Sequence, residues 1–131
     1  MTRTPPLIPV SVGELADKVT ILTIKSERIA NAEKRAAVLR EAELLRPIWE
    51  ELVSADAGLA EAFDELKTVN EELWEIEDQI RDCERRGDFG AEFVRLARSV
   101  YMVNDRRAAI KSRIDGLSGS SVREMKSYTD Y

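Results

Sequence analysis

The sequence predicts an all-α fold, an antiparallel bundle of about four helices with extended N-terminal and C-terminal tails. Three observations lead to this prediction. The 131-residue chain is rich in the helix formers Ala, Leu, Glu and Arg, and it contains few Gly and Pro residues. Apolar residues recur at helical spacing through four long segments. Short polar breaks join these segments, so the chain is expected to form one domain, residues 1–131, in which consecutive helices are antiparallel neighbours.

The predicted helices span residues 12–30, 32–53, 59–86 and 89–116. Ser11 and Glu14 have the spacing of a capping box, which predicts the start of the first helix. Asn31 is a favourable N-cap for the second helix, and Pro47 should kink or restart that helix. Gly87 is typical of the residue that follows the last turn of a helix, so the third helix is expected to end just before it. The prolines near the N-terminus predict an extended segment there, and the residues after 116 are expected to form a tail.

Composition excludes several classes of protein. The net charge is −5 and the pI is near 4.9, with basic and acidic residues interleaved, which argues against nucleic-acid binding. The chain has one cysteine, Cys83, and no histidine, which excludes an internal disulfide, a thiolate metal cage and a Ser-His-Asp triad. We therefore expect no cofactor and no metal, although a carboxylate-only Mg²⁺ or Ca²⁺ site stays open. No apolar run is long enough for a membrane span and no signal peptide is recognisable, so a cytoplasmic location is expected.

Polar side chains fall on the helix faces that should be dry. At about 100° per residue, charged and amide groups of the first, third and fourth predicted helices lie on or beside the apolar seams, and two aromatic residues border them. Arg107 is the most central, because it follows Val100 by seven residues. The candidate ligand-binding set is Lys18, Lys25, Asn70, Trp74, Glu77, Arg81, Tyr101, Asn104, Arg107 and Lys111.

Two interpretations of this set remain open. It contains five cations and one carboxylate, so in a net acidic protein it predicts an inward-facing pocket for a small anion that carries phosphate or carboxylate. Alternatively, the long side chains snorkel and the polar groups form a structural salt-bridge network that fixes helix register. Glu14, Asp17, Glu71, Asp78 or Asp105 would supply further negative charge if the helices are rotated somewhat from these estimates. A pocket predicts cations that converge on a cavity, whereas a network predicts paired cations and an apolar patch elsewhere.

The chain resembles a family of short bacterial helical proteins, DUF6165. The similarity is carried by VSVGELADKVTILTIKSERI, VNEELWEIEDQIRDCERRGDFG and FVRLARSVYMVNDRRAAIKSRI, and it extends from Val10 to the KSY at 126–128. A weaker similarity to DUF4254 rests on the blocks EL-x-DK-x-TIL-x-IK, LW-x-IED-x-IR and ND-x-RA-x-x-K. The residues matched to that second family are Glu14, Leu15, Lys25, Leu73, Trp74, Glu77, Asp78, Arg81, Asn104 and Arg107. The resemblance implies a helical bundle and a link to surface-polysaccharide metabolism, without an established activity.

Whether the protein is an enzyme stays open at this point. A helical bundle that holds a dicarboxylate, as chorismate mutases do, would suit the inventory of cations, although the motifs of those enzymes do not align here. The E-E-x-x-E of residues 71–75 resembles helical nucleotide pyrophosphohydrolases but lacks their second motif. The non-catalytic alternative is an interaction protein, for example a homodimer, with an apolar surface on the second helix made of Leu44, Leu45, Ile48, Trp49 and Leu52. Trp49 alone is expected instead to close one end of the core.

Overall fold

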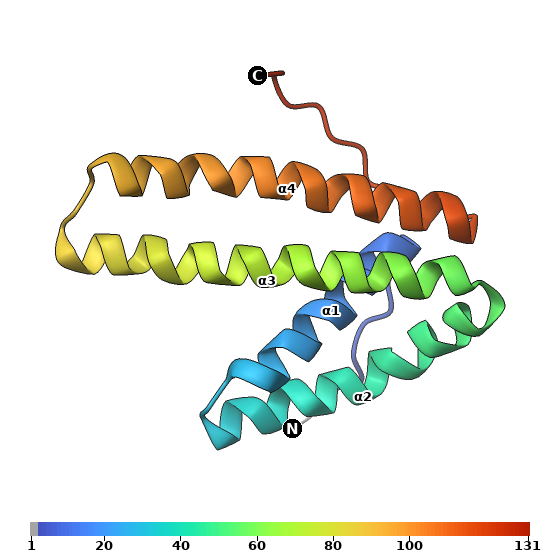
Figure 1. Cartoon of the computed structure of the whole chain (residues 1–131). Coiled ribbons are helices and arrows are strands. Elements are labelled where there is room, and N and C mark those ends of the chain that lie inside the picture. Colours follow the sequence, from blue (N-terminus) through green and yellow to red (C-terminus); the bar gives the residue numbers. More distant parts are fainter. Residues whose placement is uncertain (1–2) are drawn as a thin grey trace.

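Four helices make up the fold, and the all-α prediction is confirmed. The computed structural model describes residues 3–131, and within them there is no β-strand. The helices are α1 (Val12–Arg28), α2 (Ala32–Ala55), α3 (Ala57–Arg86) and α4 (Ala91–Ser118). Helices α3 and α4 lie side by side as a long antiparallel hairpin, and α1 and α2 form a shorter hairpin against one end of it (Figure 1).

Local sequence explains the helix ends. The Ser11 side chain accepts a hydrogen bond from the Glu14 amide at 3.0 Å, and the Asn31 side chain caps α2 in the same way. Asp56 is the whole connection between α2 and α3, because it ends one helix and its carboxylate caps the next through the Gly58 amide at 2.9 Å. Gly87 ends α3 in the left-handed region, with φ 64°, where a residue without a side chain is favoured.

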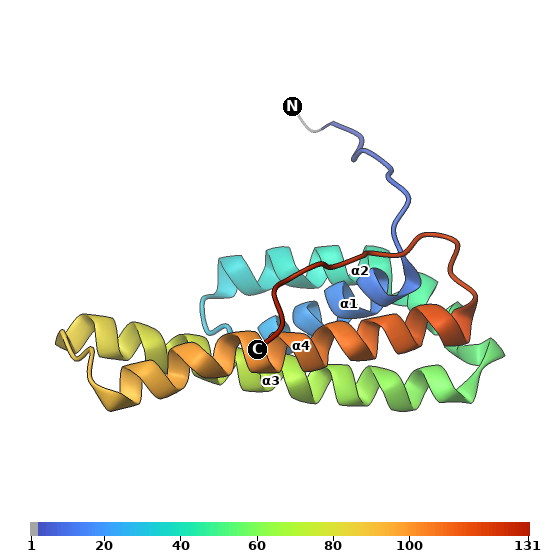
Figure 2. The ribbon, with the colours of Figure 1, turned by 90° about the horizontal axis from the view of Figure 1, so that it is seen from above.

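The observed bounds differ from the predicted ones by a few residues. α1 ends at Arg28 rather than residue 30, and α4 begins at Ala91 rather than residue 89. α4 starts later because its N-cap is Gly90, and the Asp88 carboxylate accepts a hydrogen bond from the Gly90 amide at 3.1 Å in the preceding turn. α2 continues through Pro47 without restarting, and its axis bends in the half that follows (Figure 2).

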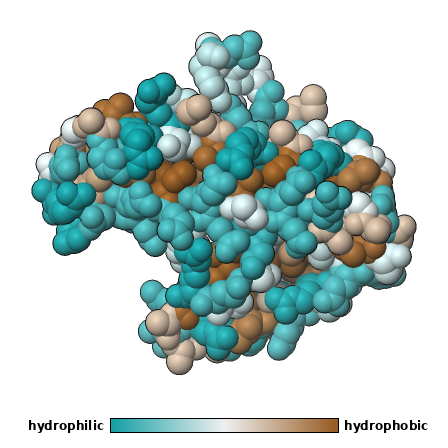
Figure 3. Space-filling model, in the orientation of Figure 1, coloured by the Kyte–Doolittle hydropathy of each residue, from teal (hydrophilic) through white to brown (hydrophobic). Residues whose placement is uncertain are grey.

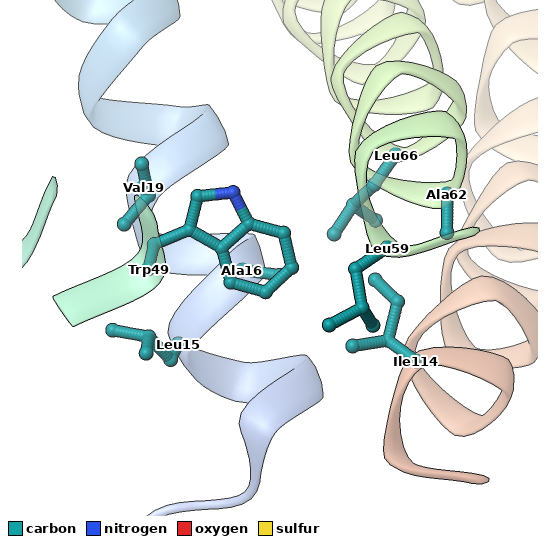
Figure 4. Close-up of a cluster of buried hydrophobic side chains, with 8 residues drawn as sticks. All are labelled: Leu15, Ala16, Val19, Trp49, Leu59, Ala62, Leu66 and Ile114. Carbon is teal, nitrogen blue, oxygen red and sulfur yellow. The ribbon is translucent and has the colours of Figure 1, made fainter. Parts of the chain in front are cut away.

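The core lies where α1 is enclosed by the other helices. α1 packs against α2, α3 and α4, so it is buried on more than one side. Trp49 is 4% exposed and stacks on Phe63, with ring centroids 5.3 Å apart, and it is therefore part of the core rather than of an outer surface. The buried apolar cluster, drawn in Figure 4, contains Leu15, Ala16, Val19, Trp49, Leu59, Ala62, Leu66 and Ile114.

The α3–α4 hairpin projects beyond the end of α1. The last residue of α1, Arg28, pairs with Glu75 of α3 at 2.9 Å, so the part of the hairpin beyond this point has no α1 or α2 beside it (Figures 1 and 2). We call residues 75–100 the arm. The surface is hollowed between the arm and the α1–α2 hairpin, as Figure 3 shows, and we call this hollow the notch. The arm and the α1–α2 hairpin thus border the notch on two sides.

The C-terminal segment after α4 returns along that helix. The Ser120 hydroxyl accepts a hydrogen bond from the Val12 amide at 3.2 Å, and the Tyr131 hydroxyl donates to Asp105 at 2.5 Å. Residues 122–131 contain no helix, which agrees with the predicted tail. In the described part of the chain, the helices are either too short or too polar to cross a bilayer.

Candidate functional site

A buried ion pair joins the first helix to the last. The side chain of Asp17 on α1 is 2% exposed, and both of its carboxylate oxygens accept hydrogen bonds from the guanidinium of Arg107 on α4. The distance from Nε of Arg107 to Oδ1 of Asp17 is 3.0 Å. Such a two-point contact fixes the orientation of both groups. Arg107 also donates to Oδ1 of the neighbouring Asn104 at 3.3 Å.

Helix α3 contributes an amide to the same carboxylate. The Asn70 side-chain nitrogen donates to Asp17 Oδ1 at 2.9 Å and to the Thr20 hydroxyl at 2.8 Å. Thr20 in turn donates its hydroxyl hydrogen to the backbone carbonyl of Asp17 at 2.7 Å. Three helices therefore meet at one carboxylate, and every buried side-chain nitrogen and oxygen among residues 3–131 has a hydrogen-bond partner.

Lys111 forms a second set of ion pairs one turn further along α4. Its ammonium lies 2.8 Å from Glu14, 3.3 Å from Glu124 of the C-terminal segment and 3.9 Å from Asp17. The Lys111 side chain is 11% exposed, so the charge is largely withdrawn from water but has three acidic neighbours. We call the side chains of Glu14, Asp17, Thr20, Asn70, Asn104, Arg107, Lys111 and Glu124 the polar network.

The ionisation of this network follows from its contacts. Burial of Asp17 opposes its ionisation, but the hydrogen bonds from Arg107 and Asn70 and the two nearby positive charges outweigh burial, so its pKa lies below the usual range. The pKa of Lys111 is raised, because the hydrogen bond to Glu14 and the charge of Asp17 outweigh the opposing effect of burial. The hydrogen bond to Asp17 likewise raises the pKa of Arg107. All three groups are therefore charged at neutral pH.

The predicted excess of inward positive charge is not present at Arg107 and Lys111. Their two positive charges face the carboxylates of Asp17, Glu14 and Glu124, so the network carries no surplus cation. The sequence interpretation counted Glu77 as the carboxylate of the cluster. In the structure Glu77 instead pairs with Arg81 on the surface of α3, where both side chains are at least half exposed.

Close packing of α1 on α4 brings the network together. The Gly13 amide donates to Oδ1 of the buried Asp115 at 2.7 Å. A Cβ atom at Gly13 would lie 2.5 Å from the carbonyl oxygen of Lys111, a distance that no side chain tolerates. Glycine at this position therefore allows the two backbones to approach, and it sets the separation across which Asp17 reaches Arg107.

The notch contains a cavity beside the network. Its volume is about 290 Å³, and α1 and α3 supply most of its lining. The walls are largely apolar, and the polar groups are an ammonium, a carboxylate, an amide and a guanidinium. The lining residues are Ile21, Ile24, Lys25, Asn70, Leu73, Trp74, Glu77 and Arg107. Five of the ten predicted ligand-binding residues, Lys25, Asn70, Trp74, Glu77 and Arg107, are therefore brought to one cavity.

Lys25 differs from the other inward cations. It is half-buried on α1, and no carboxylate of residues 3–131 lies within 4.0 Å of its ammonium. The Asn70 carbonyl oxygen also has no hydrogen-bond partner among the described residues and is accessible, since no unsatisfied atom there is fully buried. Arg107 has five N–H donors, of which three are used within the network. Three residues that line the notch therefore have hydrogen-bonding or charged groups that are unused within the chain: the Lys25 ammonium, the Asn70 side-chain oxygen and two N–H groups of Arg107.

The other predicted residues lie elsewhere. Lys18 is exposed on α1, and Arg81 is exposed on the arm. Tyr101 is 45% exposed and meets the ring of Tyr131, with centroids 5.2 Å apart, in a second hollow of about 1130 Å³ between α4 and the C-terminal segment. Asn104 lines that second hollow as well as contacting Arg107. On α2, Leu44 and Ile48 are exposed, as the alternative of an apolar interaction surface predicted, whereas Trp49 is not.

Sequence reasoning named Asp17 only as one of several acids that rotation of the helices would bring in, and it missed Asp115 and Thr20 entirely. Asp17 and Asp115 are 2% and 4% exposed, and neither belongs to the predicted set. A signal was present in α1, where residues 19–24, VTILTI, contain no charge on any face. Such a run indicates a helix surrounded by neighbours, for which an acidic residue at 17 is expected to be buried as well. Residues 3–131 contain no group of three or more His, Cys, Asp or Glu side chains placed to hold a metal ion.

The fold and the site define a small four-helix protein whose first, third and last helices are joined by a buried ion network beside an open notch. A comparison with known protein families identifies the family to which the chain belongs. The chain belongs to DUF6165, a family of unknown function, whose sequence profile matches residues 7–130. Neither the curated proteins nor the solved structures contain a match to the chain.

Proposed function

We propose that the notch binds a small molecule that carries one carboxylate or phosphate group on an apolar body. The observation that supports this proposal is Lys25, a half-buried residue whose ammonium has no carboxylate of residues 3–131 within 4.0 Å, at an apolar-walled cavity. An anionic ligand would supply the charged partner that Lys25 lacks within the chain.

The lining residues divide into an anion contact and an apolar wall. Lys25 would meet the anionic group, and the remaining N–H donors of Arg107 would bind a second oxygen of the same group. The Asn70 carbonyl oxygen would accept a hydrogen bond from a hydroxyl or amine of the ligand. Ile21, Ile24 and Leu73 line the cavity with Trp74, and these side chains suit an apolar or aromatic body.

Cavity size and charge limit the ligand further. A volume near 290 Å³ lies at the lower end of the range of about 300–1,000 Å³ typical of small-molecule pockets. One surplus cation favours a ligand with one anionic group over a ligand with several such groups. Glu77 also lines the cavity, but its carboxylate pairs with Arg81. We therefore expect Glu77 to shape the rim of the cavity rather than to contact the ligand. The proposal is therefore of binding, with no reaction assigned.

The test is thermal unfolding in the presence of matched small molecules. Benzoate, phenyl phosphate and inorganic phosphate would be compared with benzyl alcohol, which has the same aromatic body without charge. At a hundred times its Kd, a ligand stabilises the folded state by about 2.7 kcal/mol, which raises the Tm of a domain of this size by roughly 10 °C. We expect such a shift with the aromatic anions, and a smaller one or none with benzyl alcohol.

The matched variants are Lys25→Gln and Lys18→Gln. Both remove one positive charge from α1, but Lys18 is exposed and does not line the notch. We expect Lys25→Gln to abolish the ligand-induced shift and Lys18→Gln to preserve it. Equal shifts in both variants, or no shift with any anion in the wild type, would contradict the proposal and favour the network as a purely structural feature.

A further inference from the structure

The contacts of the Asn70 side-chain amide fix which way it faces. Its nitrogen donates to Oδ1 of Asp17 at 2.9 Å and to the Thr20 hydroxyl at 2.8 Å. The ionised Asp17 carboxylate can only accept hydrogen bonds, and Thr20 already donates its hydroxyl hydrogen to the backbone carbonyl of Asp17. Both neighbours therefore require a donor, so the Asn70 nitrogen faces the polar network and the side-chain oxygen is turned away from it.

The Asn70 oxygen belongs to a residue that lines the notch. This oxygen has no hydrogen-bond partner among residues 3–131, and it retains accessible surface, since no fully buried side-chain oxygen of those residues is unsatisfied. A few polar groups in an apolar cavity fix the orientation of a ligand and provide specificity. An acceptor at this position selects a ligand that carries a hydrogen-bond donor.

Arg107 has two unused N–H groups, and they are on different nitrogen atoms. Its Nε and one terminal nitrogen each donate to Asp17, and the other terminal nitrogen donates to Asn104. A guanidinium has five N–H groups, so one is left on each terminal nitrogen. Two N–H groups of one guanidinium suit two oxygens of a single carboxylate or phosphate group.

Asn70 and Arg107 are neighbours across a single atom. Nδ2 of Asn70 and Nε of Arg107 donate to the same oxygen, Oδ1 of Asp17, at 2.9 Å and 3.0 Å. A ligand whose anionic group contacts Arg107 would therefore have its next atoms beside the Asn70 amide. The donor that Asn70 selects is expected on the carbon atom that carries the anionic group.

Charge distinguishes a hydroxyl from an ammonium as that donor. Lys25 and Arg107 both line the notch, and the carboxylate of Glu77, which also lines it, pairs with Arg81. The Asp17 carboxylate is 2% exposed and already accepts from Arg107 and Asn70. A ligand ammonium would thus meet two cations without an available carboxylate, whereas a hydroxyl carries no charge.

Charge also distinguishes a carboxylate from a phosphate. A phosphate monoester carries a charge of about −1.5 to −2 at pH 7, whereas a carboxylate carries one negative charge. The Arg107 charge is balanced by Asp17, so Lys25 is the one surplus cation among the lining residues. A single negative charge matches this surplus.

We propose that the ligand of the notch is a 2-hydroxycarboxylate with an apolar body. Its carboxylate contacts Arg107 and Lys25, its hydroxyl donates to the Asn70 oxygen, and its body packs on Leu73 and Trp74. This inference rests on the proposed function, and it adds the chemistry of the carbon next to the anionic group. Because three different substituents of that carbon are contacted, one enantiomer is expected to bind more tightly than the other.

Isothermal titration calorimetry of the full chain at pH 7 tests the inference with mandelate, phenylacetate and phenylglycine. These compounds share a phenyl ring and a carboxylate, and on the carbon between them they carry a hydroxyl, a hydrogen or an ammonium. One hydrogen bond contributes a factor of about three to ten, so mandelate is expected to bind about that much more tightly than phenylacetate. Phenylglycine is expected to bind more weakly than phenylacetate, and the two enantiomers of mandelate are expected to differ.

Asn70→Leu and Thr20→Val assign the preference to the Asn70 oxygen. Both variants disturb the polar network, but only Asn70→Leu removes an acceptor that lines the notch. We expect mandelate and phenylacetate to bind equally to Asn70→Leu, whereas Thr20→Val keeps the preference for mandelate. The ratio of the two affinities is compared, so a general loss of stability does not mimic the effect, and the ligand series on the wild type needs no variant to fold.

The outcomes separate this inference from the proposed function. Equal binding of mandelate and phenylacetate to the wild type would overturn the hydroxyl contact while the anion site stands. Tightest binding of phenylglycine would overturn it as well, in favour of an amino acid. A preference for mandelate that persists in Asn70→Leu would remove Asn70 from the contact. If none of the three compounds binds, both the inference and the proposed function are contradicted.

Discussion

Arg107 and Asp17 are ninety positions apart in the chain, and their side chains meet in a two-point ion pair between α4 and α1. The Asp17 carboxylate is 2% exposed, whereas the Arg107 side chain is 27% exposed and borders the notch. The pair thus connects the core to the candidate binding site. Because Asn70 of α3 donates to the same carboxylate, a change at Asp17 affects three helices at once.

Removal of one member of this pair is expected to be strongly destabilising. In Asp17→Asn the Arg107 guanidinium loses its charged partner. In Arg107→Met the buried Asp17 carboxylate loses the guanidinium that pairs with it. Breaking a buried ion pair on one side costs about 3–5 kcal/mol. Urea unfolding at neutral pH would measure the change, and the Asp17→Asn/Arg107→Met double variant would show a loss smaller than the sum of the two single losses.

Arg106→Gln provides the matched control on the same helix. Arg106 pairs with Glu72 of α3 at 2.9 Å, but its side chain is 57% exposed. Exposed pairs contribute about 0–1 kcal/mol, so the free energy of unfolding should change little. A loss at Arg106 as large as that at Arg107 would show that burial of Asp17 is not what makes the pair important.

The fold was largely predictable because it depends on local patterns. Ser11, Asn31 and Gly87 cap or end helices in the way that their side chains dictate, and the 3.6-residue period marks the apolar faces. The pattern could not show how far along each helix the neighbouring helices cover its apolar face. Ile80 follows the same rule of spacing as Leu66, yet one is half-buried and the other fully buried, because α1 ends at Arg28.

The candidate site was predictable only in part. Helical phase correctly brought Asn70, Asn104 and Arg107 inward, since each lies beside an apolar seam. It left Asp17 outside the candidate set because α1 was assigned one narrow seam, whereas three helices surround it. Pairing between elements far apart in sequence decides which cations are neutralised, and no local pattern reports that pairing.

The pH dependence of stability follows from the two shifted groups. The pKa of Asp17 is lowered in the folded state, so its contribution is complete above about pH 3.9, the value in an unfolded chain, and is lost as the pH falls through the folded value. The pKa of Lys111 is raised, so its contribution is complete below about pH 10.4 and is lost as the pH rises through the folded value. Stability should therefore be nearly constant between about pH 5 and pH 9.

Urea unfolding from pH 2 to pH 10 would test this expectation. Asp17→Asn should be less stable than the wild type at pH 7 but should lose less stability between pH 5 and pH 2, because it lacks the titrating carboxylate. An equally steep acid loss in the variant would assign that loss to other carboxylates.

Glu124 is expected to hold the C-terminal segment against α4. Its carboxylate pairs with Lys111, whose charge lowers the pKa of Glu124, while its side chain remains 51% exposed. Glu124→Gln should change the free energy of unfolding by less than about 1 kcal/mol. It should nevertheless increase amide exchange in residues 120–131 and speed tryptic cleavage at Arg123. Glu41→Gln, an exposed position on α2, should leave both rates unchanged.

Gly13 and Gly116 form a natural pair for testing the close contact of α1 with α4. At Gly13 an added Cβ would meet the Lys111 carbonyl oxygen at 2.5 Å and the Asp115 carboxylate at 2.9 Å, whereas at Gly116 it would meet nothing within 4 Å. Gly13→Ala should therefore separate the helices and cost about 1–3 kcal/mol or more. Gly116→Ala should instead stabilise the protein by about 0.4–1 kcal/mol, because alanine restricts the unfolded chain and favours helix.

The Gly13→Ala variant also reports on the polar network. If the backbone contact sets the distance across which Asp17 reaches Arg107, separating α1 from α4 weakens the ion pair, and the acid loss of stability becomes less steep than in the wild type. Urea unfolding at pH 7 and pH 3 for both glycine variants would measure this effect. Retention of wild-type acid sensitivity in Gly13→Ala would show that the network adjusts independently of the backbone contact.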